Sequence, residues 1–132
     1  MKYLVMSVLT DESRKKLLNI ASKVPIRLLD YLYCHHVTLA YGIEDVSAYI
    51  EGDISVWKAD KIIWDSKCEC LPLTLVGGDP YCEKKFPHVT ISTDVETKPQ
   101  YSAELIESEH HTGYRFDAVE LTGCVKIIEL EE

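Results

Sequence analysis

The sequence predicts a single domain of mixed strands and helices over residues 1–132, arranged as two similar lobes that face each other across a cleft. The segment His36-Val37-Thr38 returns as His88-Val89-Thr90, each time in an apolar strand pattern that a short helical pattern follows. Ile43-Glu44 and Val95-Glu96 stand at the same offsets from the two histidines. This weak internal repeat predicts the two lobes, and the chain has room for one domain with its own core.

The N-terminal part of the chain is typical of a strand followed by a helix. Residues 3–9 form a short apolar run, and Thr10 or Asp11 can cap the helix that follows. We expect this helix to end near Pro25. Its apolar face consists of Leu17, Leu18 and Ala21.

The first motif lies in a second predicted unit of the same kind. Residues 33–41 indicate a strand that ends at Gly42, and residues 43–50 indicate a short helix that ends at Gly52. Residues 54–76 are rich in Val, Ile, Trp and Leu and predict two or three strands, closed by the turn Gly77-Gly78-Asp79-Pro80.

The second motif lies in a predicted strand over residues 86–93. Pro99 suits the first turn of a helix that continues over residues 100–109 and ends at His110-His111-Thr112-Gly113. Two further strands, over residues 116–121 and 124–130, complete the predicted sheet.

Composition and charge indicate which classes of binding partner suit this protein. The apolar run at residues 3–9 ends in charged residues without a small-residue cleavage site, so we expect a strand, a cytoplasmic protein and no membrane partner. The formal charge of −8 disfavours duplex DNA and long polynucleotides, which need clustered Lys and Arg. A small nucleotide or a chain end suits this charge better.

Five cysteines without framework-like spacing are typical of a reducing compartment. Cys68-Glu69-Cys70 together with Cys82 offers three thiolates to zinc, but Cys-x-Cys also arises when a strand points alternate residues to one face. The paired Cys-x-x-Cys spacing is missing, so we expect no metal site and no cofactor.

The two motifs place chemically useful side chains on one face. In a strand, residues i and i+2 share a face, so His36 lies beside Thr38 and His88 beside Thr90. The intervening Val37 and Val89, with Leu39 and Ile91, would point into the core. The next residues on the polar face, Ala40 and Ser92, are small and would leave space for a ligand.

Two imidazoles and two hydroxyls across a cleft suit phosphodiester cleavage. Imidazole exchanges protons near neutral pH, so one histidine can act as base and the other as acid. The base would deprotonate water or a ribose 2′-hydroxyl, and the threonines would donate hydrogen bonds to the non-bridging phosphate oxygens without a metal.

The repetition makes this pattern informative. With 5 His and 8 Thr in the chain, shuffling would produce roughly 0.3 His-x-Thr matches, and three occur. We interpret the third, His110-His111-Thr112, as a helix end, where His meets the negative pole of the helix dipole. Either remaining motif alone would suit an ordinary half-buried strand, whereas the pair with matching offsets favours function.

Paired strands of the form His-x-Thr-[Leu/Ile] resemble the 2H phosphoesterase superfamily. Within it, His36-Val37-Thr38-Leu39 and the later His88-Val89-Thr90-Ile91-Ser92-Thr93 are similar to the cyclic-phosphodiesterase domain of tRNA ligases and to phage enzymes that cleave cyclic-oligonucleotide defence signals. The resemblance covers nearly the whole chain and implies an α+β fold with antiparallel sheets, two lobes in pseudo-two-fold symmetry and a central cleft. It also implies that His36 and His88 are the acid–base pair and that Thr38 and Thr90 bind phosphate. This chain is short for the superfamily and lacks an obvious basic track for an RNA strand. Both departures argue against a long RNA substrate.

Other side chains near the motifs are weaker candidates. Phe86 and Tyr41 are candidate base-stacking residues for the substrate, with Tyr81 beside them. His35 faces away from His36 by strand alternation and is interpreted as structural. Lys84 and Lys85 could attract phosphate but equally suit a solvated charge pair.

The sequence leaves several functions open. The leading hypothesis is hydrolysis of a cyclic phosphodiester: the 2′,3′-cyclic phosphate of a nucleotide or RNA end, or a cyclic nucleotide or oligonucleotide signal. A variant uses the ribose 2′-hydroxyl as nucleophile and makes the cyclic phosphate. A non-catalytic nucleotide-binding module is the alternative from another class, and a partner-binding protein is a third.

Overall fold

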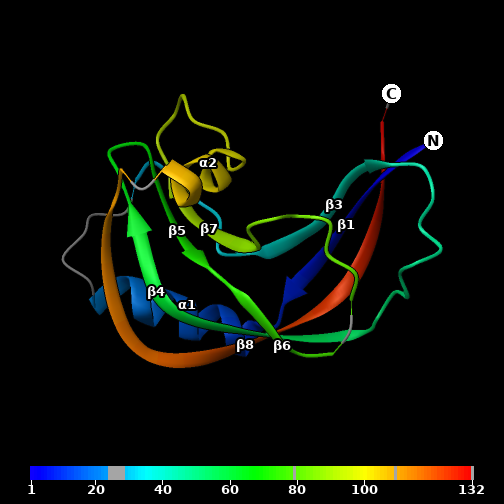
Figure 1. Cartoon of the computed structure of the whole chain (residues 1–132), viewed down its shortest axis with the longest axis horizontal. Helices are drawn as coiled ribbons and strands as arrows, with labels where there is room; N and C mark the ends of the chain where they lie inside the picture. The colour runs from blue at the N-terminus through cyan, green and yellow to red at the C-terminus, as the bar shows by residue number, and fades with distance from the viewer. Residues whose placement is uncertain (24–28, 79, 109, 132) are drawn as a thin grey trace.

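The computed structural model describes residues 1–23, 29–78, 80–108 and 110–131 (Figure 1). Within these ranges, eight strands and two helices follow one another. In chain order they are β1 (Lys2–Leu9), α1 (Asp11–Lys23), β2 (Tyr31–Leu32), β3 (His36–Ile43), β4 (Ile54–Trp64), β5 (Cys68–Pro72), β6 (Thr74–Gly77), β7 (His88–Thr93), α2 (Tyr101–Ser108) and β8 (Thr112–Leu130). The mixture of a mostly antiparallel sheet with two helices agrees with an α+β fold.

All eight strands belong to one antiparallel sheet, whose order is β2-β7-β3-β1-β8-β4-β5, with β6 on β4. A further pairing between β7 and β5 closes this path on itself. Figure 1 shows β7 running toward β3 in the middle of the molecule, with α2 on one side and the paired ends of β1 and β8 on the other. The division into two lobes with pseudo-two-fold symmetry stays a prediction.

The first strand and helix are confirmed. The Thr10 hydroxyl accepts the Ser13 N–H at 3.2 Å and caps α1, as expected for a helix that starts at Asp11. Leu17 and Ala21 are buried, but Leu18 is 38% exposed, so its place on the apolar face was wrong. The expected helix end near Pro25 lies outside the described residues.

The helix expected over residues 43–50 is wrong. Gly42, at φ 72°, lies within β3 and does not end it, and the chain after Ile43 forms turns. The Asp45 carboxylate accepts the Ser47 N–H at 2.9 Å, a local bond that offers the backbone an alternative to a helix. The first motif strand therefore has no helix after it, unlike the second, and the repeat is limited to the strands.

The later elements are largely as expected. Three strands occupy residues 54–77, and α2 follows Pro99, whose carbonyl accepts the Ser102 N–H. β8 was expected as two strands but is continuous from Thr112, since pairing with both β1 and β4 carries it through Gly123. The His111 Nδ1 atom lies 3.0 Å from the Leu105 carbonyl, so His111 adjoins the α2 end, but Thr112 and Gly113 belong to β8 and not to the helix end that was expected.

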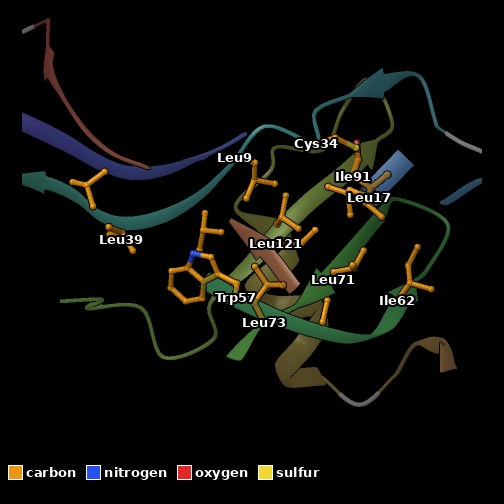
Figure 2. Packing of buried hydrophobic residues seen from close by; sticks show 14 of the residues in the cluster. Leu9, Leu17, Cys34, Leu39, Trp57, Ile62, Leu71, Leu73, Ile91 and Leu121 are labelled. Carbon is orange, nitrogen blue, oxygen red and sulfur yellow. The ribbon is translucent and has the colours of Figure 1, made fainter. Parts of the chain in front are cut away.

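The core lies on the sheet face that carries Val37 and Val89. Figure 2 shows Trp57 packed among Leu9, Leu73 and Leu121 in this cluster, and α1 adds Leu17. The Trp57 indole donates to Ser55 at 3.1 Å and Ser7 at 3.3 Å, so its polar atom is satisfied although the ring is fully buried. A smaller cluster lies under α2 and contains Ile63, Cys68, Cys70 and Leu105.

Neither α1 nor α2, the helices of the described residues, is long and apolar enough to cross a bilayer.

Candidate active site

The two motif strands meet at one residue pair. Val37 of β3 pairs with Val89 of β7 in antiparallel register, and both valines are fully buried. Neighbours along a strand point to opposite faces, so the histidines and threonines that flank the valines all lie on the other face. We call this the motif face; its four motif side chains are His36, Thr38, His88 and Thr90. The structure thus brings the two motifs together as neighbouring strands of one sheet, whereas the cleft between two lobes stays a prediction.

His88 is held by the backbone beside it. Its Nδ1 atom lies 2.8 Å from the Phe86 carbonyl oxygen, and a carbonyl can only accept, so Nδ1 carries a proton. The Nε2 atom of His88 is therefore the one left for other chemistry. Burial lowers the pKa of His88, the Phe86 carbonyl acts in the opposite direction, and the nearby Lys84 ammonium lowers it further.

His36 contacts the preceding histidine. The Nδ1 atoms of His35 and His36 lie 3.0 Å apart, and the rings meet edge to face at 81° with centroids 5.2 Å apart. The expectation that His35 faces away is therefore wrong. β3 begins only at His36, and Cys34 has a positive φ of 54°, so strand alternation does not extend back to His35.

The environment of His36 keeps its ring neutral. Burial, followed by the neighbouring imidazoles of His35 and His88, lowers the pKa of His36 to about 4. The electrostatic effect of His88 on His36 also shows that the two motif histidines lie within range of each other.

The two motif threonines differ in their surroundings. Among the described residues, no group hydrogen-bonds the Thr38 hydroxyl, which is half-buried on β3. Thr90 is only 7% exposed, and its hydroxyl lies 2.8 Å from Ser102 Oγ and donates to the Pro99 carbonyl at 3.3 Å. Thr38 is thus open to a ligand, whereas Thr90 holds the start of α2 against β7.

A bulge in β3 changes which residue follows Thr38 on the motif face. Thr38 pairs with Met6 of β1, and the next β1 residue, Val5, pairs with Ala40, so Leu39 is the extra residue. Ala40 therefore faces the core, contrary to expectation, and Tyr41 returns to the motif face.

Tyr41 is 58% exposed and lines a hollow of about 500 Å³ at the end of the sheet near both chain termini. The other residue expected to leave ligand space, Ser92, is buried and donates to Glu69, so this expectation is also wrong.

Phe86 contributes its backbone more than its ring. β7 begins at His88, so Phe86 lies outside the strand and the alternation that placed it beside His88 does not apply. Its carbonyl holds His88, while its ring lies under the Lys85 ammonium at 5.2 Å. Tyr81 is exposed and its ring lies 6.3 Å from that of Tyr49, so no contact with the motif residues places it in the site.

Two lysines place positive charge at the motif face. Lys84 is close enough to lower the pKa of His88. Met6 pairs with both Thr38 and Lys126, so the exposed Lys126 of β8 lies on the same face, two strands from Thr38. Lys126 could not be predicted from the sequence, because only the strand register relates it to the motifs.

The cysteines do not form the zinc site that was considered. Cys68 and Cys70 are buried beneath α2, whereas Cys82 packs against the main core beside β3. Among the described residues, no group of three or more His, Cys, Asp or Glu side chains is placed to hold a metal ion.

A comparison with known protein families matches most of this chain to one family. The family model described as the fungal tRNA ligase phosphodiesterase domain matches residues 30–127, well over half of the chain, and includes both motifs. No curated protein and no solved structure matched the chain. The matched family is a 2H phosphoesterase family, which supports a phosphodiesterase activity. The chain belongs to the family of the fungal tRNA ligase phosphodiesterase domain, among the 2H phosphoesterases.

Proposed function

We propose that this protein hydrolyses a cyclic phosphodiester without a metal, with His36 as general base and His88 as general acid. One observation carries the proposal: the Val37–Val89 pair sets both imidazoles on the same face of the sheet. The family match supports a phosphodiesterase activity in general. The roles of the two histidines are our inference from their surroundings.

The base is His36 because its environment disfavours the imidazolium. Burial and two neighbouring imidazoles hold the pKa of His36 at about 4, so its ring is neutral at pH 5 and above. Burial also lowers the pKa of His88, but the Phe86 carbonyl opposes this effect and supports the protonated ring, so we assign His88 as the acid. Environments that separate the pKa values of two titratable groups are the usual basis for assigning acid and base.

The proposed reaction moves two protons. His36 Nε2 takes a proton from water as the water oxygen forms a bond to phosphorus, and the bond from phosphorus to the leaving ribose oxygen breaks as His88 Nε2–H protonates that oxygen. Thr38 donates to a non-bridging oxygen, where negative charge develops. Lys84 and Lys126 supply positive charge near this anion.

An RNA end with a 2′,3′-cyclic phosphate is the substrate class that we favour. The matched family is named for a tRNA ligase domain, which supports an RNA-end substrate. Tyr41 on the motif face supplies an exposed ring on which a terminal base can stack. The formal charge of −8 favours contact with a chain end over a long RNA track. Cyclic nucleotide and oligonucleotide signals are the competing substrates.

Hydrolysis of a substrate panel in excess EDTA tests this proposal. The panel contains 2′,3′-cyclic mononucleotides, an RNA with a terminal cyclic phosphate, and cyclic di- and trinucleotides. We expect turnover of the RNA end, reduced at least about 100-fold in His36→Ala and in His88→Ala. His110→Ala, which changes an exposed histidine outside the motif face, is the matched control.

The other outcomes are equally informative. Preference for a cyclic oligonucleotide would replace the substrate class, and formation of a cyclic phosphate would show the 2′-hydroxyl to be the nucleophile. Tight binding without turnover would indicate a non-catalytic nucleotide-binding module, the second candidate. The engagement of the Thr90 hydroxyl by α2 is the observation that favours this second candidate.

A further inference from the structure

The backbone bulges where the chain enters the first motif. The Cys34 N–H donates to the Thr90 carbonyl at 3.0 Å, while Val37 pairs with Val89. Thr90 and Val89 are adjacent on β7, but the residues opposite them, Cys34 and Val37, are three positions apart. His35 and His36 are therefore the two extra residues. Bulges of this kind re-aim side chains and often lie beside active sites.

This bulge is held in a strained conformation. Cys34 is a non-glycine residue with a φ of 54°, in the left-handed region that L side chains rarely adopt. Two bonds fix the backbone after it: Arg14 Nε donates to the Cys34 carbonyl at 2.9 Å, and the Leu9 N–H donates to the His35 carbonyl at 3.0 Å. The surrounding structure thus maintains a turn that a regular strand would not contain.

The turn brings together two side chains that a strand would separate. Successive residues of a strand point to opposite faces, yet the Nδ1 atoms of His35 and His36 lie 3.0 Å apart. A hydrogen bond at this distance requires a proton on one Nδ1 and a lone pair on the other. Whichever nitrogen carries the proton determines the state of Nε2 on the same ring, and Nε2 of His36 is the atom that the proposed reaction uses.

We propose that His35 is a positioning residue for His36: its Nδ1 lone pair accepts the Nδ1 proton of His36 and so keeps the Nε2 lone pair of His36 available as the base. The importance of this contact for catalysis rests on the proposed function, whereas the tautomer itself does not. The arrangement resembles the third member of a catalytic triad, which orients the base through its other ring nitrogen.

A neutral imidazole acceptor differs from a carboxylate in one respect. It orients the ring without adding a negative charge, so it leaves the pKa of His36 low, and the neighbouring imidazole in fact contributes to lowering it. Among the described residues, the other titratable groups at the motif face are His88 on β7, Tyr41 on β3, Cys124 and Lys126 on β8, and Lys84 in the segment before β7. The charge-neutral contact therefore suits a base that is already unprotonated in mildly acidic solution.

Nitrogen NMR of the imidazoles in the substrate-free protein tests the tautomer directly. We expect the neutral His36 ring to carry its proton on Nδ1, and His35→Ala to shift the population toward the Nε2–H form. His35→Asn places an amide oxygen near the position of the lost Nδ1 and should restore the Nδ1–H form. A His36 ring protonated on Nε2 in the unsubstituted protein would overturn the proposal.

Kinetics of the same variants provide the second readout. We expect His35→Ala to lower kcat about 10-fold with little change in KM, and His35→Asn to restore most of it. His35→Asp also accepts the proton, but its negative charge should raise the pKa of His36 and move the rising limb of the pH profile to higher pH. If kcat, tautomer and pH profile were all unchanged in His35→Ala, His35 would have no positioning role.

The two proposals fail in different ways. Full activity in His36→Ala would refute the proposed base while the NMR result for the His35–His36 contact remained valid. If His36→Ala lost activity while His35→Ala kept the kcat, tautomer and pH profile of the unsubstituted protein, the proposed function would stand and the positioning role of His35 would be refuted. Because His35 is exposed, all three substitutions at this position should leave the core packing intact.

Discussion

The Phe86 carbonyl oxygen lies 2.8 Å from His88 Nδ1, and this contact separates His88 from the other motif histidine. A carbonyl partner supports the protonated ring of His88, whereas His36 has another imidazole as its partner. Burial lowers the pKa of both rings, and the neighbouring imidazoles of His35 and His88 help to bring that of His36 to about 4. The two histidines of a repeated motif therefore have different proton affinities because the residues before each motif differ.

This difference predicts an acidic pH optimum. The base must be neutral, so kcat/KM should rise with pH through a value of about 4, the pKa of His36. The acid must be protonated, so kcat/KM should fall through the pKa of His88, which lies below 6.5. A pH–rate profile on the cyclic-phosphate substrate should be bell-shaped between these limits. A rate that increases steadily from pH 6 to 8 would contradict the assignment.

Lys84 should control the falling limb. Its ammonium lowers the pKa of His88, so Lys84→Gln should raise that pKa and move the falling limb to higher pH. The KM should also rise, because a positive charge near the phosphate is lost. Lys85→Gln is the matched control, since the Lys85 ammonium lies over the Phe86 ring. Equal displacement of the limb in both variants would indicate a general charge effect.

Substitution of Thr38 should affect mainly the activity, whereas substitution of Thr90 should affect mainly the stability. Thr38→Val removes a hydroxyl that is open to the ligand and should lower kcat/KM about 100-fold without changing the urea midpoint. Thr90→Val removes the bonds to Ser102 and Pro99 and should lower the free energy of unfolding by about 1–3 kcal/mol. Thr38→Ser keeps the hydroxyl and should remain active. If Thr90→Val unfolded normally but lost activity, Thr90 would be the phosphate contact that the family resemblance implies.

Tyr41 should contribute binding through its ring. Stacking on a base is worth roughly 1–3 kcal/mol, so Tyr41→Ala should raise KM for the RNA end about 10-fold, and Tyr41→Phe should not. Tyr114→Ala removes an exposed ring from the part of β8 that pairs with Ile62, and it is the control. An unchanged KM in Tyr41→Ala would exclude Tyr41 from the substrate site.

Two glycines with positive φ should respond differently to alanine. A Cβ on Gly52 meets open space, so Gly52→Ala should cost only the conformational strain, about 1 kcal/mol. A Cβ on Gly78 would collide with the Ile54 carbonyl oxygen, so Gly78→Ala should cost about 3 kcal/mol. Urea unfolding of both variants checks this. Equal losses would show that the turn after β6 can move away from Ile54.

The local sequence pattern was sufficient to predict those strands and helices that depend on a few adjacent residues. The apolar run at residues 3–9, the alternation within the strand predicted over residues 86–93, the Thr10 cap and the helix after Pro99 are properties of a few adjacent residues, so they were predictable. The same alternation predicted that the motif side chains oppose the buried Val37 and Val89. Residues 43–50 were predicted wrongly because the Asp45 side chain competes locally for the backbone, an effect that hydrophobic periodicity does not reveal.

The sequence by itself determined that two His-Val-Thr strands exist and which face of each carries the imidazole, because strand periodicity is a local property. Only the tertiary structure decided the partners of those side chains. The bulge at Leu39 places Tyr41 instead of Ala40 on the motif face. The Thr90 hydroxyl contacts α2, and the turn at Cys34 places the His35 ring against that of His36. Each of these depends on register or on contacts between segments distant in the chain, which no local pattern encodes.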